Sequence, residues 1–146
     1  MEGEREHVGR TALHGVLVAV AALALVGLVA VGAWLVPDPA GYGTHEQLGL
    51  KACSAVEWFG VPCPGCGVTT AVTWFARGEP LRSLATQPFG FTLALAAALA
   101  LPAALAAHAV GVDLGVTLLR LRWGRWLGGV ALLALASWAY KAWSMA

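Results

Sequence analysis

Three long apolar stretches dominate the pattern of hydrophobic and polar positions along the chain. The first, residues 11–36, contains no charged side chain. As a helix it would be about 39 Å long, whereas the hydrocarbon core of a bilayer needs only ~30 Å. Pro37 and Pro39 follow it and would end a helix. We therefore expect the first membrane-crossing helix over about residues 11–36.

A cleaved signal peptide is the alternative for this first stretch. Arg5 and Arg10 precede it, and Val31-Gly32-Ala33 has the small residues of a cleavage site. A signal peptide's hydrophobic region is ~7–15 residues long, however, and this run is longer. We therefore favour a retained anchor.

The second apolar stretch covers about residues 89–110, and the third, shorter one covers about residues 126–143. Gly128 and Gly129 in the third would allow a neighbouring helix to approach closely. Lys141 is expected to extend outward along its own stem toward the interface. The pattern predicts an all-α membrane protein of one domain, residues 1–146. It has about three transmembrane helices and a cysteine-containing segment with short helices at about residues 37–88.

Composition supports the membrane interpretation. Hydrophobic residues make up 59% of the chain, charged residues make up 12%, and the mean hydropathy is +0.73. A soluble chain usually carries ~25% charge. The net charge of +1 without a basic stripe gives no sign of nucleic-acid binding. The expected partners are membrane lipid and, as a further candidate, other membrane proteins.

Arginines predict how the chain lies in the membrane. One group precedes the first helix and the other precedes the third: Arg5 and Arg10, then Arg120, Arg122 and Arg125. Positive charges in short loops favour the cytoplasmic side. We therefore expect an integral protein of the cytoplasmic (inner) membrane, with a cytoplasmic N-terminus and an extracytoplasmic cysteine loop. Residues 113–122 read as an amphipathic interfacial turn, in which Asp113 and Arg120 could pair.

All three cysteines lie in the loop between the first two predicted crossings. Cys63 and Cys66 form a C-x-x-C pair, and Pro64 and Gly65 between them favour a tight turn, in which glycine can adopt a positive φ. Apolar residues then recur at helical spacing: Val68, Ala71, Val72 and Phe75. They predict a short interfacial or re-entrant helix that ends near Gly78, with Thr69, Thr70 and Thr73 mostly off its apolar face.

Several chemistries fit this segment. A helix start at Cys66 would lower its pKa. Two thiolates on one turn form half of a zinc site, and Cys53 and His45 could supply the other half, since the stretch from Ala55 to Val61 can fold back. Thiol–disulfide exchange by the pair Cys63 and Cys66 is the redox alternative. A structural disulfide or inert thiols, with His45 bonded within its own turn, is the third.

The cysteine segment resembles the domain-of-unknown-function 2752 family of small bacterial membrane proteins. The resemblance covers about residues 41–100, and the matching positions are the run PCPGCGVT at Pro62 to Thr69, then Ala71, Gly78 and Gln87-Pro88-Phe89, with Gly43-Thr44-His45, Gln47-Leu48-Gly49 and Cys53 upstream. Many members carry Arg at the position of Thr70 and Asn at that of Gln87. The resemblance implies a membrane location and a functional CPxCG turn.

Two functions remain open at this point. The chain contains no Walker loop, GxGxxG, HExxH or GxSxG. This favours a non-enzymatic accessory or assembly subunit of a membrane complex, whose CPGC loop is held by a metal or a disulfide. A membrane thiol oxidoreductase is the alternative. A transporter is less favoured, because only Thr92, His108 and Ser137 offer polar groups within the spans.

Overall fold

The computed structural model describes residues 11–145, which contain helices and turns and no strand. The elements in chain order are α1 (Ala12–Trp34), the 3₁₀ helix η1 (Thr44–Leu48), α2 (Ser54–Phe59), α3 (Val68–Ala76), α4 (Pro80–Thr86), α5 (Pro88–Ala109), α6 (Leu114–Arg120) and α7 (Trp123–Met145). The predicted all-α class is therefore confirmed. Arg5 and Arg10 lie outside the described residues.

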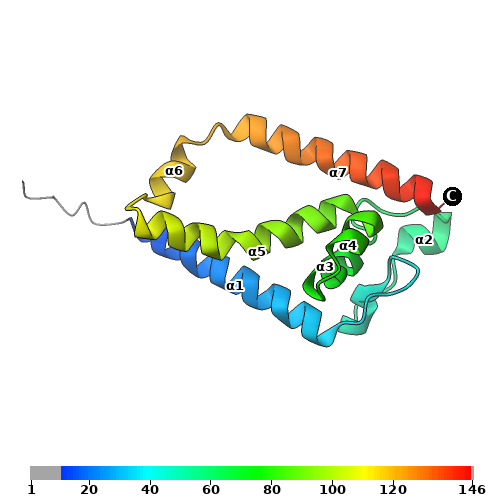
Figure 1. Cartoon of the computed structure of the whole chain (residues 1–146). Helices are drawn as coiled ribbons and strands as arrows, with labels where there is room; N and C mark the ends of the chain where they lie inside the picture. Colours follow the sequence, from blue (N-terminus) through cyan, green and yellow to red (C-terminus); the bar gives the residue numbers. More distant parts are fainter. Residues whose placement is uncertain (1–10, 146) are drawn as a thin grey trace, which may run out of the picture.

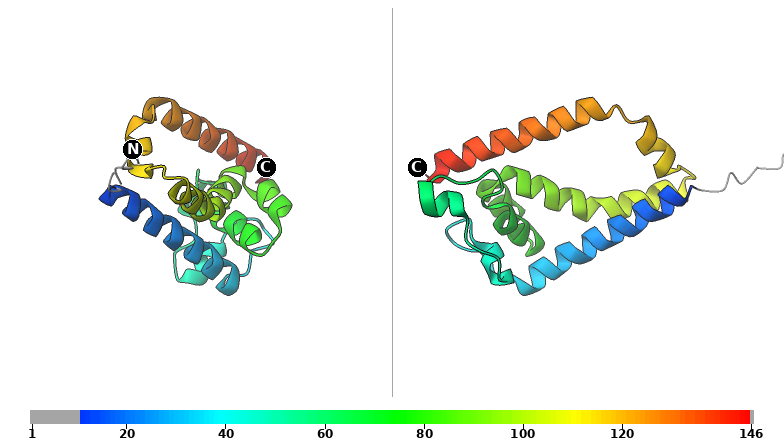
Figure 2. Two further views of the ribbon diagram at one scale, coloured as in Figure 1. Left: turned by 60° about the vertical axis from the view of Figure 1, so that its left-hand side comes forward. Right: turned by 180° about the vertical axis from the view of Figure 1, so that it is seen from behind.

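The three long helices run between two ends of the molecule (Figure 1). α1 and α5 pack along each other, whereas α7 runs apart from them over most of its length and approaches the short helices α2–α4 at its C-terminal end (Figure 2). No helix within residues 11–145 makes the close approach that Gly128 and Gly129 would allow. A Cβ added at either glycine would meet no described atom within 4 Å.

Within residues 11–145, two helices are long and apolar enough to cross a membrane, α1 with a mean hydropathy of 2.8 and α5 with a mean hydropathy of 2.0. Only 11% of an apolar 18-residue stretch of α1 and 17% of the corresponding stretch of α5 are buried inside the molecule. The core helix of a soluble protein would be mostly buried, so these exposed apolar surfaces fit a lipid environment better. α7 is equally long but less apolar, because Arg125 and Lys141 lie within it.

One end of the molecule is closed by polar contacts between α1, α5 and α6. The carboxylate of Asp113 accepts hydrogen bonds from the backbone N–H and hydroxyl of Thr11, at 2.7 and 2.9 Å. Leu114 N–H donates to Nδ1 of His14, so Nε2 of the neutral ring carries the proton and donates to Nδ1 of His108 at 3.0 Å.

The predicted pairing of Asp113 with Arg120 does not form. Asp113 instead caps α6, where it accepts from Val116 N–H, and it bonds to the start of α1. The one ion pair within residues 11–145 joins Arg82 to Glu79. A capping carboxylate that already accepts several N–H bonds gains little from an exposed arginine.

The other end holds the short helices, and α3 packs against both α1 and α5. Glycines permit this packing: a Cβ at Gly32 would lie 2.8 Å from the Ala76 side chain, and one at Gly90 would lie 2.9 Å from Val68 O. α3 begins at the predicted place, after the second cysteine of the motif, and Gly78 follows its end with φ +81°.

Two threonines of α3, Thr70 and Thr73, are fully buried. Thr70 shares a 2.8 Å hydrogen bond with the hydroxyl of Thr44 in η1, and Thr73 donates to Thr69 O at 2.8 Å. A buried hydroxyl is tolerated when it is hydrogen-bonded. α3 therefore has neighbours on its polar side as well as on its apolar side.

Candidate metal centre

The CPGC motif forms a tight turn that leads directly into α3. Cys66 N–H donates to Cys63 O at 2.9 Å, which closes the turn predicted from Pro64 and Gly65. The glycine with a positive φ is Gly67, at +85°, and Gly65 is not among the positive-φ glycines. Gly67 is the N-cap of α3, so the conformational demand lies at the helix start and outside the turn.

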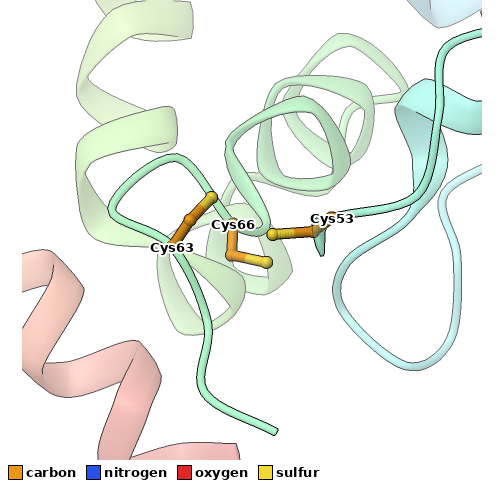
Figure 3. A group of neighbouring side chains, drawn as sticks. All are labelled: Cys53, Cys63 and Cys66. Atoms are coloured by element: carbon orange, nitrogen blue, oxygen red, sulfur yellow. The ribbon is translucent and has the colours of Figure 1, made fainter. Parts of the chain in front are cut away.

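The third cysteine is brought to this turn by α2. Cys53 is the N-cap of α2, and Gly60 ends that helix with φ +67°. The fold-back predicted for residues 55–61 is thus observed. The three sulfurs lie within 4.8 Å of one another (Figure 3), and all three cysteines are free thiols. We call Cys53, Cys63 and Cys66 the thiol cluster.

The thiol cluster is electrostatically uneven. The backbone N–H of Val56, in the first turn of α2, favours the thiolate of Cys53 and lowers its pKa to about 7. Burial and the neighbouring Cys53 instead raise the pKa of Cys66 to about 12. The prediction of a lowered pKa at Cys66 is therefore wrong: its side chain is 5% exposed, and desolvation outweighs the helix start.

His45 does not join the thiol cluster in this structure. It lies in η1, and its Nε2 donates to Lys51 O at 3.1 Å, within its own loop. Among the residues that the structure describes, the group of ligand atoms within 4.8 Å of one another contains cysteine sulfurs alone. The prediction of a Cys₃His set has no geometric support here beyond its three sulfurs.

Lys141 lies near the CPGC turn, and the prediction that its side chain extends outward to the membrane interface is wrong. It is 4% exposed instead of extending outward. Its Nζ donates to Gly41 O at 2.9 Å and lies 6.0 Å from the Tyr42 ring centroid. A Cβ at Gly67 would be only 3.2 Å from Lys141 Cε. A Cβ at Gly41 would likewise lie 2.9 Å from Lys141 Nζ. Because Gly41 and Gly67 have no side chains, the Lys141 side chain fits beside the CPGC turn.

Buried polar groups gather at this end of the molecule. Of the buried polar residues between positions 11 and 145, only His14 lies at the opposite end, and the others are Thr44, Thr70, Thr73, Ser83, Gln87, Ser137 and Lys141. α7 is held here by two further hydrogen bonds, from the Trp138 indole to Pro62 O at 2.8 Å and from the Tyr140 hydroxyl to Ala85 O at 2.6 Å. The thiol cluster therefore sits in the most polar and most cross-linked part of the fold.

A comparison with known families gives a match at this segment. Residues 53–101 match the family described as Protein of unknown function (DUF2752). The matched segment begins at Cys53 and runs through the CPGC turn, α3 and α4 into α5. The resemblance predicted from the motif is confirmed. No curated protein and no solved structure matches the chain.

Three converging thiols can bind a soft or borderline metal ion. Sulfur ligands favour Zn²⁺ or Cu⁺ over hard ions such as Mg²⁺ and Ca²⁺. Sulfurs bound to one zinc at ~2.3 Å would lie roughly 3.8 Å apart in tetrahedral geometry, and the observed limit of 4.8 Å requires only a small contraction. The donor set therefore fits a metal ion, and a fourth ligand is left to water or another molecule.

Proposed function

We propose that this protein is a metal-binding integral membrane protein whose thiol cluster holds a transition-metal ion, with zinc as the candidate. The observation that carries the proposal is the convergence of three sulfurs from two separate segments within 4.8 Å. Cys53 arrives from the start of α2, and the other two arrive from the turn before α3. A bound ion would fix these short helices to one another, which no described disulfide does.

The proposed topology has three crossings, by α1, α5 and α7. The support is that the three helices alternate in direction between the same two ends (Figure 1). α1 also packs on α5 and α6, as a retained anchor would. With the N-terminus cytoplasmic, Arg120, Arg122 and Arg125 lie on the cytoplasmic side and the thiol cluster on the extracytoplasmic side of the inner membrane.

The proposed role is that of an accessory or assembly subunit in a larger membrane complex. α7 supports this role because much of its apolar surface is not covered by the rest of the chain. Its exposed large apolar side chains are Trp126, Leu127, Val130, Leu132 and Leu135. Lipid or a second membrane protein would cover this surface. The bound metal would then stabilise the end of the protein that contains the short helices α2–α4 and the cysteine-containing loop.

Metal analysis of the detergent-purified full chain, combined with thiol counting under denaturing conditions, tests the proposal. We expect about one metal ion per chain and three free thiols. Serine substitution of either Cys63 or Cys66 should lower the folded yield about equally, because an incomplete site binds poorly. Purified protein that lacks metal and does not take up zinc would exclude this function.

Thiol–disulfide exchange is the second candidate, and the pKa of about 7 at Cys53 favours it. A Cys53 thiolate would attack a partner disulfide, form a mixed disulfide and release one partner thiolate. A second thiol of the cluster would then attack the Cys53 sulfur, form an internal disulfide and release the reduced partner. Serine in place of the resolving cysteine should trap mixed disulfides, whereas serine in place of the attacking Cys53 should prevent them from forming. A metal site instead predicts that the serine substitutions lower the folded yield about equally.

Protease digestion of terminal epitope tags in sealed vesicles tests the topology. Three crossings require the N-terminal and C-terminal tags to be digested from opposite sides. Glutamine at Arg120, Arg122 and Arg125 together should give mixed orientations of α5 and α7. Digestion of both tags from one side would refute the three-crossing arrangement.

A further inference from the structure

Lys141 presents an unusual electrostatic situation, because a lysine is rarely this buried without an acidic partner. Its ammonium group has three N–H donors, and the hydrogen bond to Gly41 O uses one of them. The Tyr42 ring, at 6.0 Å, adds a weak attraction for the cation. Neither neighbour carries a negative charge.

The described carboxylates do not supply the missing charge. The side chains of Asp38 and Glu46 approach Gly43, two residues from the carbonyl that Lys141 contacts, yet neither forms an ion pair with the lysine. The lysine side chain instead passes against Gly67, the residue that directly follows Cys66. A Cβ at Gly67 would lie 3.2 Å from Lys141 Cε and 3.5 Å from its Nζ, so the ammonium group is adjacent to the CPGC turn.

We propose that Lys141 is the built-in counter-cation of the thiol cluster and adapts it to a divalent metal ion. The inference rests on the proposed metal function and extends it to the charge of the ion. Binding of M²⁺ to three thiols releases three protons and leaves a complex of charge −1. The ammonium of Lys141 brings the total to zero. A monovalent ion such as Cu⁺ would leave a total of −1 in the same buried surroundings.

The arrangement also connects α7 to the metal centre. Lys141 is contributed by α7, whereas the cysteines come from residues 53–66. The charge attraction therefore acts between α7 and the cysteine-containing segment that lies between α1 and α5. It adds to the hydrogen bonds that Trp138 and Tyr140 donate from α7. A metal-loaded cluster should hold the end of α7 more firmly than the metal-free cluster does.

Three variants of the full chain in detergent test the inference. Lys141→Met removes the charge and keeps the length of the side chain, and Lys141→Arg keeps the charge. Tyr140→Phe is the matched control, because it removes a neighbouring α7 contact to Ala85 without changing any charge. Co²⁺ and Zn²⁺ affinities are measured by competition with a chromophoric chelator, and thermal unfolding of the metal-free proteins is followed by circular dichroism.

We expect Lys141→Met to weaken Co²⁺ and Zn²⁺ binding by roughly tenfold or more relative to Tyr140→Phe. The metal-free Lys141→Met protein should unfold at the same or a higher temperature than the wild type, since an uncompensated buried charge has been removed. A purely structural lysine would instead lower metal-free stability and leave intrinsic metal affinity unchanged. Lys141→Arg should retain the wild-type affinity, and if arginine cannot be accommodated the comparison with Tyr140→Phe still decides.

The outcomes separate this inference from the metal function itself. If the wild type binds both ions and Lys141→Met binds them equally tightly, the counter-cation role is overturned and the metal function stands. If the wild type binds neither ion, the metal function is overturned, and the counter-cation role falls with it.

Discussion

Alanine in place of Gly67 should disrupt the packing of the CPGC turn against the loop at Gly41 and against the Lys141 side chain of α7. Gly67 has φ +85°, and an alanine in this left-handed conformation costs about 1–2 kcal/mol. Its Cβ would also lie 2.7 Å from Gly41 O, which is backbone, and 3.2 Å from Lys141 Cε. Relieving such a contact typically costs a further ~1–3 kcal/mol. We therefore expect Gly67→Ala to lower the free energy of unfolding by about 2–5 kcal/mol.

Gly78→Ala provides the matched control. Gly78 has nearly the same φ as Gly67, +81° against +85°, but a Cβ there would meet nothing within 4 Å. The gain from reduced unfolded-state entropy is common to both variants and cancels. Denaturant unfolding of the two proteins in the same detergent should therefore differ by about 1–3 kcal/mol. Equal destabilisation would refute the close approach of Gly41 and Lys141 to the turn.

Other parts of the account can be tested in the same preparation. Gly32→Ala should destabilise the protein by ~1–3 kcal/mol through its contact with α3, whereas Gly27→Ala in the same helix, with free space around it, should be neutral or slightly stabilising in thermal unfolding. Alkylation of metal-free protein, mapped by mass spectrometry, should modify Cys53 with a midpoint near pH 7 and should reach Cys66 only on unfolding; equal rates would contradict the assigned environments. Asp113 has a pKa lowered to about 2 by Thr11 N–H, so its stabilising contribution is complete above the ordinary value of 3.8 and is lost as the pH falls toward 2. The difference in melting temperature between wild type and Asp113→Ala should shrink over that pH interval, and a constant difference would show that the capping charge is unimportant.

Local sequence signals predicted much of the helical framework. Uncharged apolar runs indicate membrane-crossing helices because length and hydropathy are properties of one segment. They placed α1 and α5 to within a few residues. The CPGC turn and the start of α3 were also predictable, since the relevant hydrogen bonds join residues that are close in the sequence. The same holds for the return of Cys53 over the short helix α2.

The features that depend on distant contacts were not predictable in this way. Lys141 lies near one end of a long helix, where a lysine would normally extend to the interface. Its burial results from Gly41 and Gly67, which are far from it in the sequence and leave room for its side chain. The raised pKa of Cys66 likewise results from burial by the folded chain, which the sequence position at a helix start does not reveal.

X-ray absorption spectroscopy of the zinc-loaded full chain in detergent tests the central claim most directly, because it counts and identifies the atoms bound to the metal. The account predicts about one zinc ion per chain with three sulfur neighbours at ~2.3 Å and one lighter ligand. A zinc environment of nitrogen and oxygen alone, or a chain that binds no zinc after loading under reducing conditions, would contradict it.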